Sequence, residues 1–157
     1  MKLKTIFELI KGKRDIKSLM VLNKLFGKKC LFIEKPIIYK NEIIKYLNNH
    51  KVKEVFLLIE EEKEIPEEIL NLLKEKKIKI NLHVHLIPDT TKISYEKKYI
   101  KTARALDYLI TNFILPTEVA YGYWRFSYKD PELKKIVNKL NLKLSKRRWH
   151  IYDYWLI

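Results

Sequence analysis

Short apolar runs and amphipathic stretches alternate along the first half of the chain. The runs at 30–34, 53–59 and 78–87 have the length of strands, and the second is too continuous for a strand with one wet face. Between them, in 41–47 and 66–77, apolar residues recur every three or four positions, as in an amphipathic helix. Strands that alternate with helices of about ten residues predict parallel pairing through right-handed crossovers.

The second half of the chain predicts a long helix and two aromatic strands. Ser94 is placed to cap a helix that continues to about Phe113. An aromatic strand is expected at 118–128, a basic helix begins at Asp130, and a last strand is expected at 147–157. The apolar stripe of the long helix, which we expect to face the core, consists of Ile100, Ala103, Leu106, Ile110 and Phe113.

These elements predict an α+β fold whose N-terminal half is α/β-like. We expect a single mixed sheet of about five strands flanked by helices, with two further helices at 3–10 and 15–26. A chain of 157 residues without a linker or an internal repeat is expected to form one domain over residues 1–157.

The scarcity of glycine and cysteine excludes several classes of site. The three glycines, Gly12, Gly27 and Gly122, are too far apart for a glycine-rich phosphate loop. The lone Cys30 excludes an internal disulfide framework and a cysteine-based zinc site. Neither an apolar run of about 18 residues nor a signal segment is present, so we expect a soluble, cytoplasmic protein, or one of the host cytoplasm if the chain is viral.

The net charge of +14 is unevenly distributed. Residues 1–50 carry +8, residues 51–76 carry −3 and residues 77–157 carry +9. A basic chain with an acidic middle favours a polyanionic partner bound to particular faces, with nucleic acid first and an anionic membrane second. The alternative is that the lysines reflect a lysine-rich proteome, as AT-rich or thermophilic genomes encode.

Two histidines in the third predicted strand are the sharpest chemical feature. His83 and His85 are two positions apart, so their side chains share one face of the strand. Paired imidazoles bind divalent metals, and Asp89, just past the strand, could supply an oxygen ligand. We expect Mg²⁺ or Mn²⁺, with Zn²⁺ as an alternative. The acids of 60–64 are further candidates for the oxygen, and two histidines without a metal remain the plainer interpretation.

The same strand carries a resemblance to a known family. The segment from Asn81 to Ile87 resembles the metal-binding strand of the HUH endonucleases, a group that includes rolling-circle replication initiators and small transposases. The resemblance implies a metal that polarises a DNA phosphate, and a tyrosine on a nearby helix that attacks it to form a phosphotyrosine link. Tyr108 is the nucleophile carried over, with Tyr99 as an alternative. The chain is also similar in style to small nucleases of crenarchaeal filamentous viruses.

Basic residues and aromatic rings are interleaved in the last third of the chain. Cations neutralise phosphates while exposed rings stack on bases, a combination that single-stranded nucleic-acid grooves use. The alternative is that the rings fill the core and the lysines serve solubility. The candidate phosphate-binding residues are Lys97, Lys101, Arg104, Arg125, Arg147 and Arg148.

The metal pair and the basic charge predict a small metal-dependent nuclease that cleaves or transfers phosphodiesters in single- or double-stranded DNA. His83, His85 and Asp89 would act as metal ligands or as acid and base. The alternatives are a non-catalytic DNA- or RNA-binding protein, in which the histidines have no role, and a structural protein of a virus or plasmid. No membrane partner is expected, and a homo-oligomer is left open.

Overall fold

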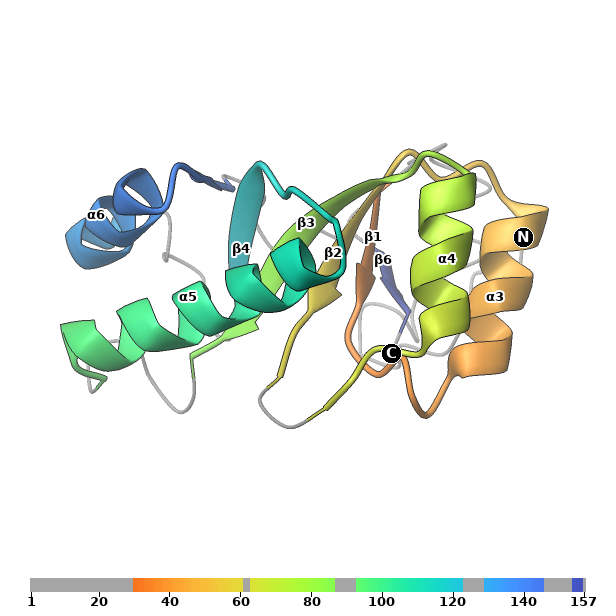
Figure 1. Ribbon diagram of the computed structural model, residues 1–157, viewed down its shortest axis with the longest axis horizontal. Helices are drawn as coiled ribbons and strands as arrows, with labels where there is room; N and C mark the ends of the chain where they lie inside the picture. Colours follow the sequence, from red (N-terminus) through yellow and green to blue (C-terminus); the bar gives the residue numbers. More distant parts are fainter. Residues whose placement is uncertain (1–29, 61–62, 87–92, 123–128, 146–153, 157) are drawn as a thin grey trace, which may run out of the picture. The chain divides into compact units, whose positions relative to one another are not determined.

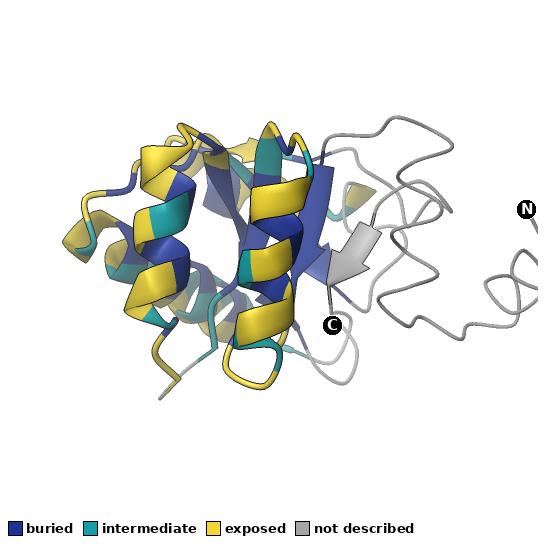
Figure 2. Ribbon diagram, turned by 90° about the vertical axis from the view of Figure 1, so that its right-hand side faces the viewer, coloured by how far each residue is buried: buried dark blue, intermediate teal, exposed yellow. Residues whose placement is uncertain are grey.

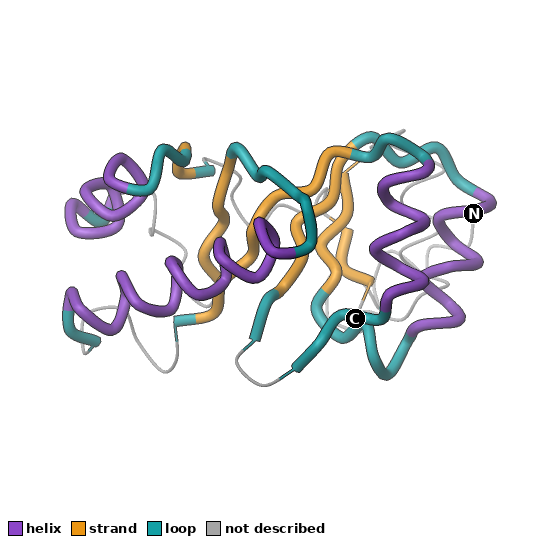
Figure 3. The backbone as a smooth tube through the Cα atoms, in the orientation of Figure 1, coloured by secondary structure: helices purple, strands orange, loops and turns teal. Residues whose placement is uncertain are grey.

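The computed structural model describes residues 30–60, 63–86, 93–122, 129–145 and 154–156. Helices and strands alternate through these residues (Figures 1 and 3). In chain order the elements are β1 (Cys30–Ile33), α3 (Lys40–Asn49), β2 (Glu54–Leu58), α4 (Glu67–Glu75), β3 (Lys79–His85), α5 (Tyr95–Thr111), β4 (Glu118–Gly122), α6 (Pro131–Lys139), β5 (Lys143–Leu144) and β6 (Tyr154–Leu156).

The strands form one sheet, in the hydrogen-bonded order β5-β4-β3-β2-β1-β6. The registers described for β1 with β6, β3 with β4 and β4 with β5 are all parallel. The predicted fold class, a sheet of α/β character flanked by helices, is therefore confirmed. The later strands run parallel to their neighbours in these pairs, whereas the sequence predicted a mixed sheet.

Contacts within the chain divide it into two compact units. The first consists of Met1–Val55, Ile65–Ile78 and Trp149–Ile157, and the second of Phe56–Glu64 and Lys79–Arg148. The first contains β1, β6, α3 and α4, the second contains β3, β4, β5, α5 and α6, and β2 is divided between Val55 and Phe56. The expectation of one domain over 1–157 stays a prediction.

Burial follows the expected pattern for strands covered by helices. Val55, Phe56 and Leu57 of β2 are each 0% exposed, as the continuous apolar run of that strand predicts. Figure 2 colours the described strands β1 to β4 mostly as buried, while each helix shows an exposed side. In the first unit, the inward sides of α3 and α4 carry Ile43, Tyr46, Leu47, Ile69, Leu70 and Leu73.

The long helix α5 turns a different face inward from the one predicted. Ile110 is 45% exposed and Phe113, just beyond the helix, is 93% exposed, while Ala103 and Leu106 are half-buried, so no member of the expected apolar stripe is fully buried. The inward face carries polar residues that are paired with other elements, which hydrophobic periodicity alone does not reveal. The buried residues of α5 are Lys98, Thr102, Ala105 and Leu109.

Three helices end in the same way although none has glycine at its end. Lys77, Phe113 and Asn141 follow α4, α5 and α6, and each has a φ between 53° and 61°. In each case the next residue is buried, and its backbone N–H closes the last helical turn as in a Schellman motif. These closures run from Ile78 to Leu73 (2.9 Å), from Ile114 to Leu109 (2.9 Å) and from Leu142 to Val137 (2.8 Å).

Side chains cap the beginnings of α5 and α6. The hydroxyl of Ser94 accepts a hydrogen bond from the backbone N–H of Lys97, which confirms the predicted cap. Asp130 accepts from the N–H groups of Glu132 and Leu133, with proline in the first helical turn. Within the described residues, no helix is long and apolar enough to cross a membrane.

Candidate metal centre

Strand β3 carries both histidines at its carboxyl end. Its residues are buried on both faces, because Asn81 is 0% exposed and His83 is 1% exposed, while His85 is half-buried. The face that the sequence predicts to be polar is therefore enclosed rather than open to water. Buried polar groups need partners, and the side-chain amide oxygen Oδ1 of Asn81 accepts from the backbone N–H of Glu118 at 3.3 Å.

The neighbouring strand β4 fixes the orientation of His83. Nδ1 of His83 lies 3.0 Å from the carbonyl oxygen of Ala120, in the strand that pairs with β3. Because a carbonyl oxygen only accepts, Nδ1 carries a proton and donates it. In the neutral ring this leaves the lone pair on Nε2. A metal-binding histidine commonly donates its other ring N–H in this way to a carbonyl or a carboxylate.

The two imidazole rings contact each other through their Nε2 atoms. Nε2 of His83 lies 2.9 Å from Nε2 of His85, and the two rings are nearly perpendicular, with an interplanar angle of 88°. In the neutral pair, Nε2–H of His85 donates to the lone pair of His83. The same two nitrogens can instead converge on one cation when His85 carries its proton on Nδ1.

Gly122 borders this pair from β4. It is the register partner of His85, and a Cβ built on it would lie 2.7 Å from Nε2 of His85 and 3.0 Å from Cε1 of His83. The nearest atom of all would be Cδ2 of His85. The two rings therefore occupy the space that any other residue at position 122 would need.

The imidazole pair is the metal-ligating feature that the second unit brings together by itself. The sequence therefore identified both imidazoles.

Sequence reasoning missed Gly122. This residue gave no signal in the sequence, because only the register of β3 and β4 shows what its missing side chain leaves room for.

The other predicted site residues are spread along the chain. Asp89, Arg125, Arg147 and Arg148 lie outside the residues that the structure describes. Tyr108 is half-buried in α5, where its backbone carbonyl accepts from the side chain of Asn112. On the same helix Lys97 and Arg104 are exposed and Lys101 is half-buried.

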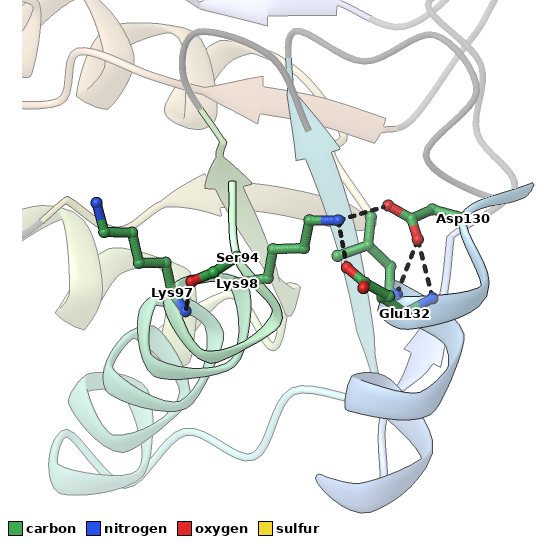
Figure 4. A network of polar contacts seen from close by, with 6 residues as sticks. Ser94, Lys97, Lys98, Asp130 and Glu132 are labelled. Carbon is green, nitrogen blue, oxygen red and sulfur yellow. Dashed lines mark hydrogen bonds and ion pairs between the residues drawn. The ribbon is translucent and has the colours of Figure 1, made fainter. Parts of the chain in front are cut away.

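A second polar cluster holds α5 to α6 (Figure 4). Lys98 is only 4% exposed. Its Nζ lies 3.1 Å from Oδ2 of Asp130 and 2.7 Å from Oε2 of Glu132. Burial lowers the pKa of Lys98, but the hydrogen bonds that its ammonium donates to Glu132 and Asp130, together with their negative charges, outweigh burial and raise that pKa above its usual value. The ammonium therefore stays charged inside the second unit.

The same face of α5 fixes the strand beside the histidines. The hydroxyls of Thr102 and Tyr121 lie 2.7 Å apart, and burial raises the pKa of the Tyr121 phenol well above its ordinary value. Tyr121 stands between Ala120 and Gly122, the two residues of β4 that border the imidazoles. This hydroxyl pair thus holds the wall of the candidate site in place.

Comparison with known proteins does not extend this geometry. The chain matches no family model, no curated protein and no solved structure. The chemistry of the described side chains is therefore what supports a function.

Proposed function

We propose that the protein is a metal-dependent hydrolase that cleaves phosphodiester bonds in DNA, with His83 and His85 as metal ligands. The observation that carries the proposal is the buried imidazole pair, whose Nε2 atoms lie 2.9 Å apart while Nδ1 of His83 bonds a backbone carbonyl. That arrangement presents two nitrogen ligands in a fixed orientation.

The imidazole pair favours a catalytic centre over a structural one, because two protein ligands would leave positions open for water at a bound metal, as catalytic zinc sites do. A metal held there would lower the pKa of a bound water and polarise the bond under attack. Asp89, which the sequence predicts as the oxygen ligand, lies outside the described residues.

Two imidazoles also narrow the choice of metal. Imidazole nitrogen suits Zn²⁺ and other first-row transition ions, whereas Mg²⁺ prefers oxygen ligands and water. We therefore favour Zn²⁺ or Mn²⁺ at this site over the Mg²⁺ that the sequence also allowed.

The basic charge supports a phosphodiester substrate. The chain carries a net charge of +14, and Lys97, Lys101 and Arg104 follow one another at helical spacing along α5. Cations along one helix can neutralise consecutive phosphates of a nucleic-acid strand. In this proposal they bind the DNA backbone while the metal site performs the cleavage.

A second candidate is hydrolysis of a carboxylic ester or amide. The observation that favours it is again the imidazole pair, because histidine ligands also hold the zinc ion of enzymes in which the metal polarises a carbonyl. The basic charge would then have no part in binding the substrate.

The test compares metals, substrates and variants of the full chain. Purified protein is stripped with chelator, reloaded with Zn²⁺, Mn²⁺ or Mg²⁺, and assayed on single-stranded DNA, double-stranded DNA and an aryl ester. We expect Zn²⁺ or Mn²⁺ to restore DNA cleavage, and His85→Ala to reduce it at least about 100-fold. The matched control is His50→Ala, because His50 stacks on Tyr46 and is not part of the imidazole pair.

The outcomes separate the candidates. Cleavage of the ester alone favours the second candidate, and DNA binding without cleavage under every metal favours a non-catalytic binding protein. Cleavage of DNA by His85→Ala at the wild-type rate overturns the metal mechanism.

A further inference from the structure

Gly122 lies beside the imidazole pair but has no side chain that could bind a metal. Metal binding therefore does not explain why glycine occupies this position. Glycine in a strand weakens the strand, because it adds backbone entropy to the unfolded chain and has no side chain to pack. Its φ lies outside the left-handed range, so the backbone conformation does not require glycine at this position. What requires glycine is space, because a Cβ would fall within 3.0 Å of ring atoms of both histidines.

We infer that Gly122 is a positioning residue, whose missing side chain lets the His85 imidazole lie against that of His83. The inference deepens the proposed function, on which it rests, because it names what places the second nitrogen ligand.

The partners of Gly122 determine which group would yield to an added methyl group. The β4 backbone is held by its parallel register with β3, and Tyr121 is tied to Thr102. The His83 ring is buried and bonded to Ala120. His85 is half-buried at the end of its strand, so its ring is the group that can rotate away. An alanine at position 122 would therefore displace one ligand while both imidazoles stay in the chain.

The test is a double-mutant cycle with two readouts. The four proteins are the wild type, Gly122→Ala, His85→Ala and the double variant, with His50→Ala as the control for metal bound elsewhere. The first readout is Zn²⁺ affinity by chelator competition, where we expect Gly122→Ala to bind at least about 10-fold more weakly than the wild type. In the His85→Ala background, the same alanine should change the affinity little.

The second readout is the free energy of unfolding of the metal-free proteins in chelator. Gly122→Ala should destabilise the wild type more than it destabilises His85→Ala, since the second background lacks the ring that the methyl group meets. An equal effect in both backgrounds overturns the inference, because it would show that glycine serves the strand and not the histidine.

Folding and metal binding are kept apart by this design. If Gly122→Ala fails to fold but the double variant folds like His85→Ala, the inference is supported, and failure of both overturns it. If the wild type binds no metal, the proposed function fails, while the stability cycle still reports on the contact between Gly122 and His85.

Discussion

Nδ1 of His83 carries a proton because its partner, the carbonyl oxygen of Ala120, can only accept a hydrogen bond. The tautomer of this one ring therefore decides that Nε2 faces His85. Site-specific ¹⁵N NMR of the imidazoles in metal-free protein should show His83 as the Nδ1–H tautomer. Addition of Zn²⁺ should shift the Nε2 resonances of His83 and His85 and leave those of His50 in place. A His83 ring protonated on Nε2 at neutral charge would contradict the geometry.

At the residue scale, a residue other than glycine that has a positive φ marks a position where a substitution by glycine can raise the free energy of unfolding. Lys77 has a φ of 53°, a conformation that costs an L-residue about 1 kcal/mol relative to glycine. We expect Lys77→Gly to raise the free energy of unfolding by about 0.5–1 kcal/mol.

The control for this change is one residue earlier. Lys76 has a φ of −80°, so Lys76→Gly has no strain to relieve and should destabilise the protein. Urea denaturation of both variants at one pH measures the two signs, and destabilisation by Lys77→Gly would contradict the strain argument.

The sequence could predict residues that act through their own chemistry. The histidine pair and the Ser94 cap follow from short-range spacing, and the structure confirms that the two imidazoles come together and that Ser94 caps the helix. Gly122 matters because of residues that lie far away in the chain. A single sequence shows its role only after the register of β3 and β4 is known.

At the element scale, α5 shows why periodicity alone chose the wrong face. Leu109 is 0% exposed whereas its neighbour Ile110 is 45% exposed, although both are apolar. We expect Leu109→Ala to cost about 2–5 kcal/mol of unfolding free energy and Ile110→Ala to cost less than about 0.5 kcal/mol beyond any difference in helix propensity. Thermal unfolding of the two variants measures the difference, and equal destabilisation would contradict the orientation of the helix.

The charged cluster between α5 and α6 is the second element-scale feature. Lys98→Met keeps the buried stem of the side chain but leaves Asp130 and Glu132 without the ammonium. Because hydrogen bonds to charged groups contribute about 1.5–3 kcal/mol, we expect a loss of that order at neutral pH. Lys40, which pairs with Glu68 at the surface, provides the control, since Lys40→Met should cost less than about 1 kcal/mol.

The dependence of the free energy of unfolding on alkaline pH tests the same cluster, because the raised pKa values predict a loss of stability as pH rises. The pKa of Lys98 is raised above its usual 10.5, so its contribution is complete below pH 10.5 and is lost as pH rises through the folded-state value. Tyr121 acts in the same direction, because its raised pKa keeps the folded phenol neutral while the unfolded phenol ionises near pH 10.0. Unfolding measured from pH 8 to 12 should show a smaller alkaline loss in Tyr121→Phe and in Lys98→Met than in the wild type.

At the scale of the whole molecule, the alternation of strands and helices was the most predictable feature. Strand β2 and helices α3 and α4 lie close to the positions that apolar spacing predicts, because each is a local pattern with a strong period. The parallel pairing of β1 with β6 could not be predicted, since it joins residues from opposite ends of the chain. The parallel direction of β4 likewise depends on the crossover through α5, and not on its aromatic composition.

The proposed phosphate contacts of α5 predict how DNA binding depends on salt. If Lys97, Lys101 and Arg104 contact phosphates, their joint replacement by glutamine should weaken DNA binding at every sequence. It should also flatten the dependence of log K on log salt by about 0.9 for each contact removed. The matched control carries the same loss of charge on α6, at the exposed residues Lys134, Lys135 and Lys139. An equal change in both slopes would show that net charge, and not the face of α5, attracts DNA.

The register of β1 with β6 also determines when, during biosynthesis, the edge of β1 can acquire its partner strand. Leu31 pairs with Tyr154, about 120 positions later, so a ribosome that adds about 5–20 residues per second takes about 6–25 s to supply the partner strand. Until then the β1 edge that β6 will cover has unpaired N–H and C=O groups, which are a template for the wrong strand. The nascent chain therefore passes through an interval of seconds in which a chaperone, or another nascent chain, can reach an edge that the finished protein keeps paired.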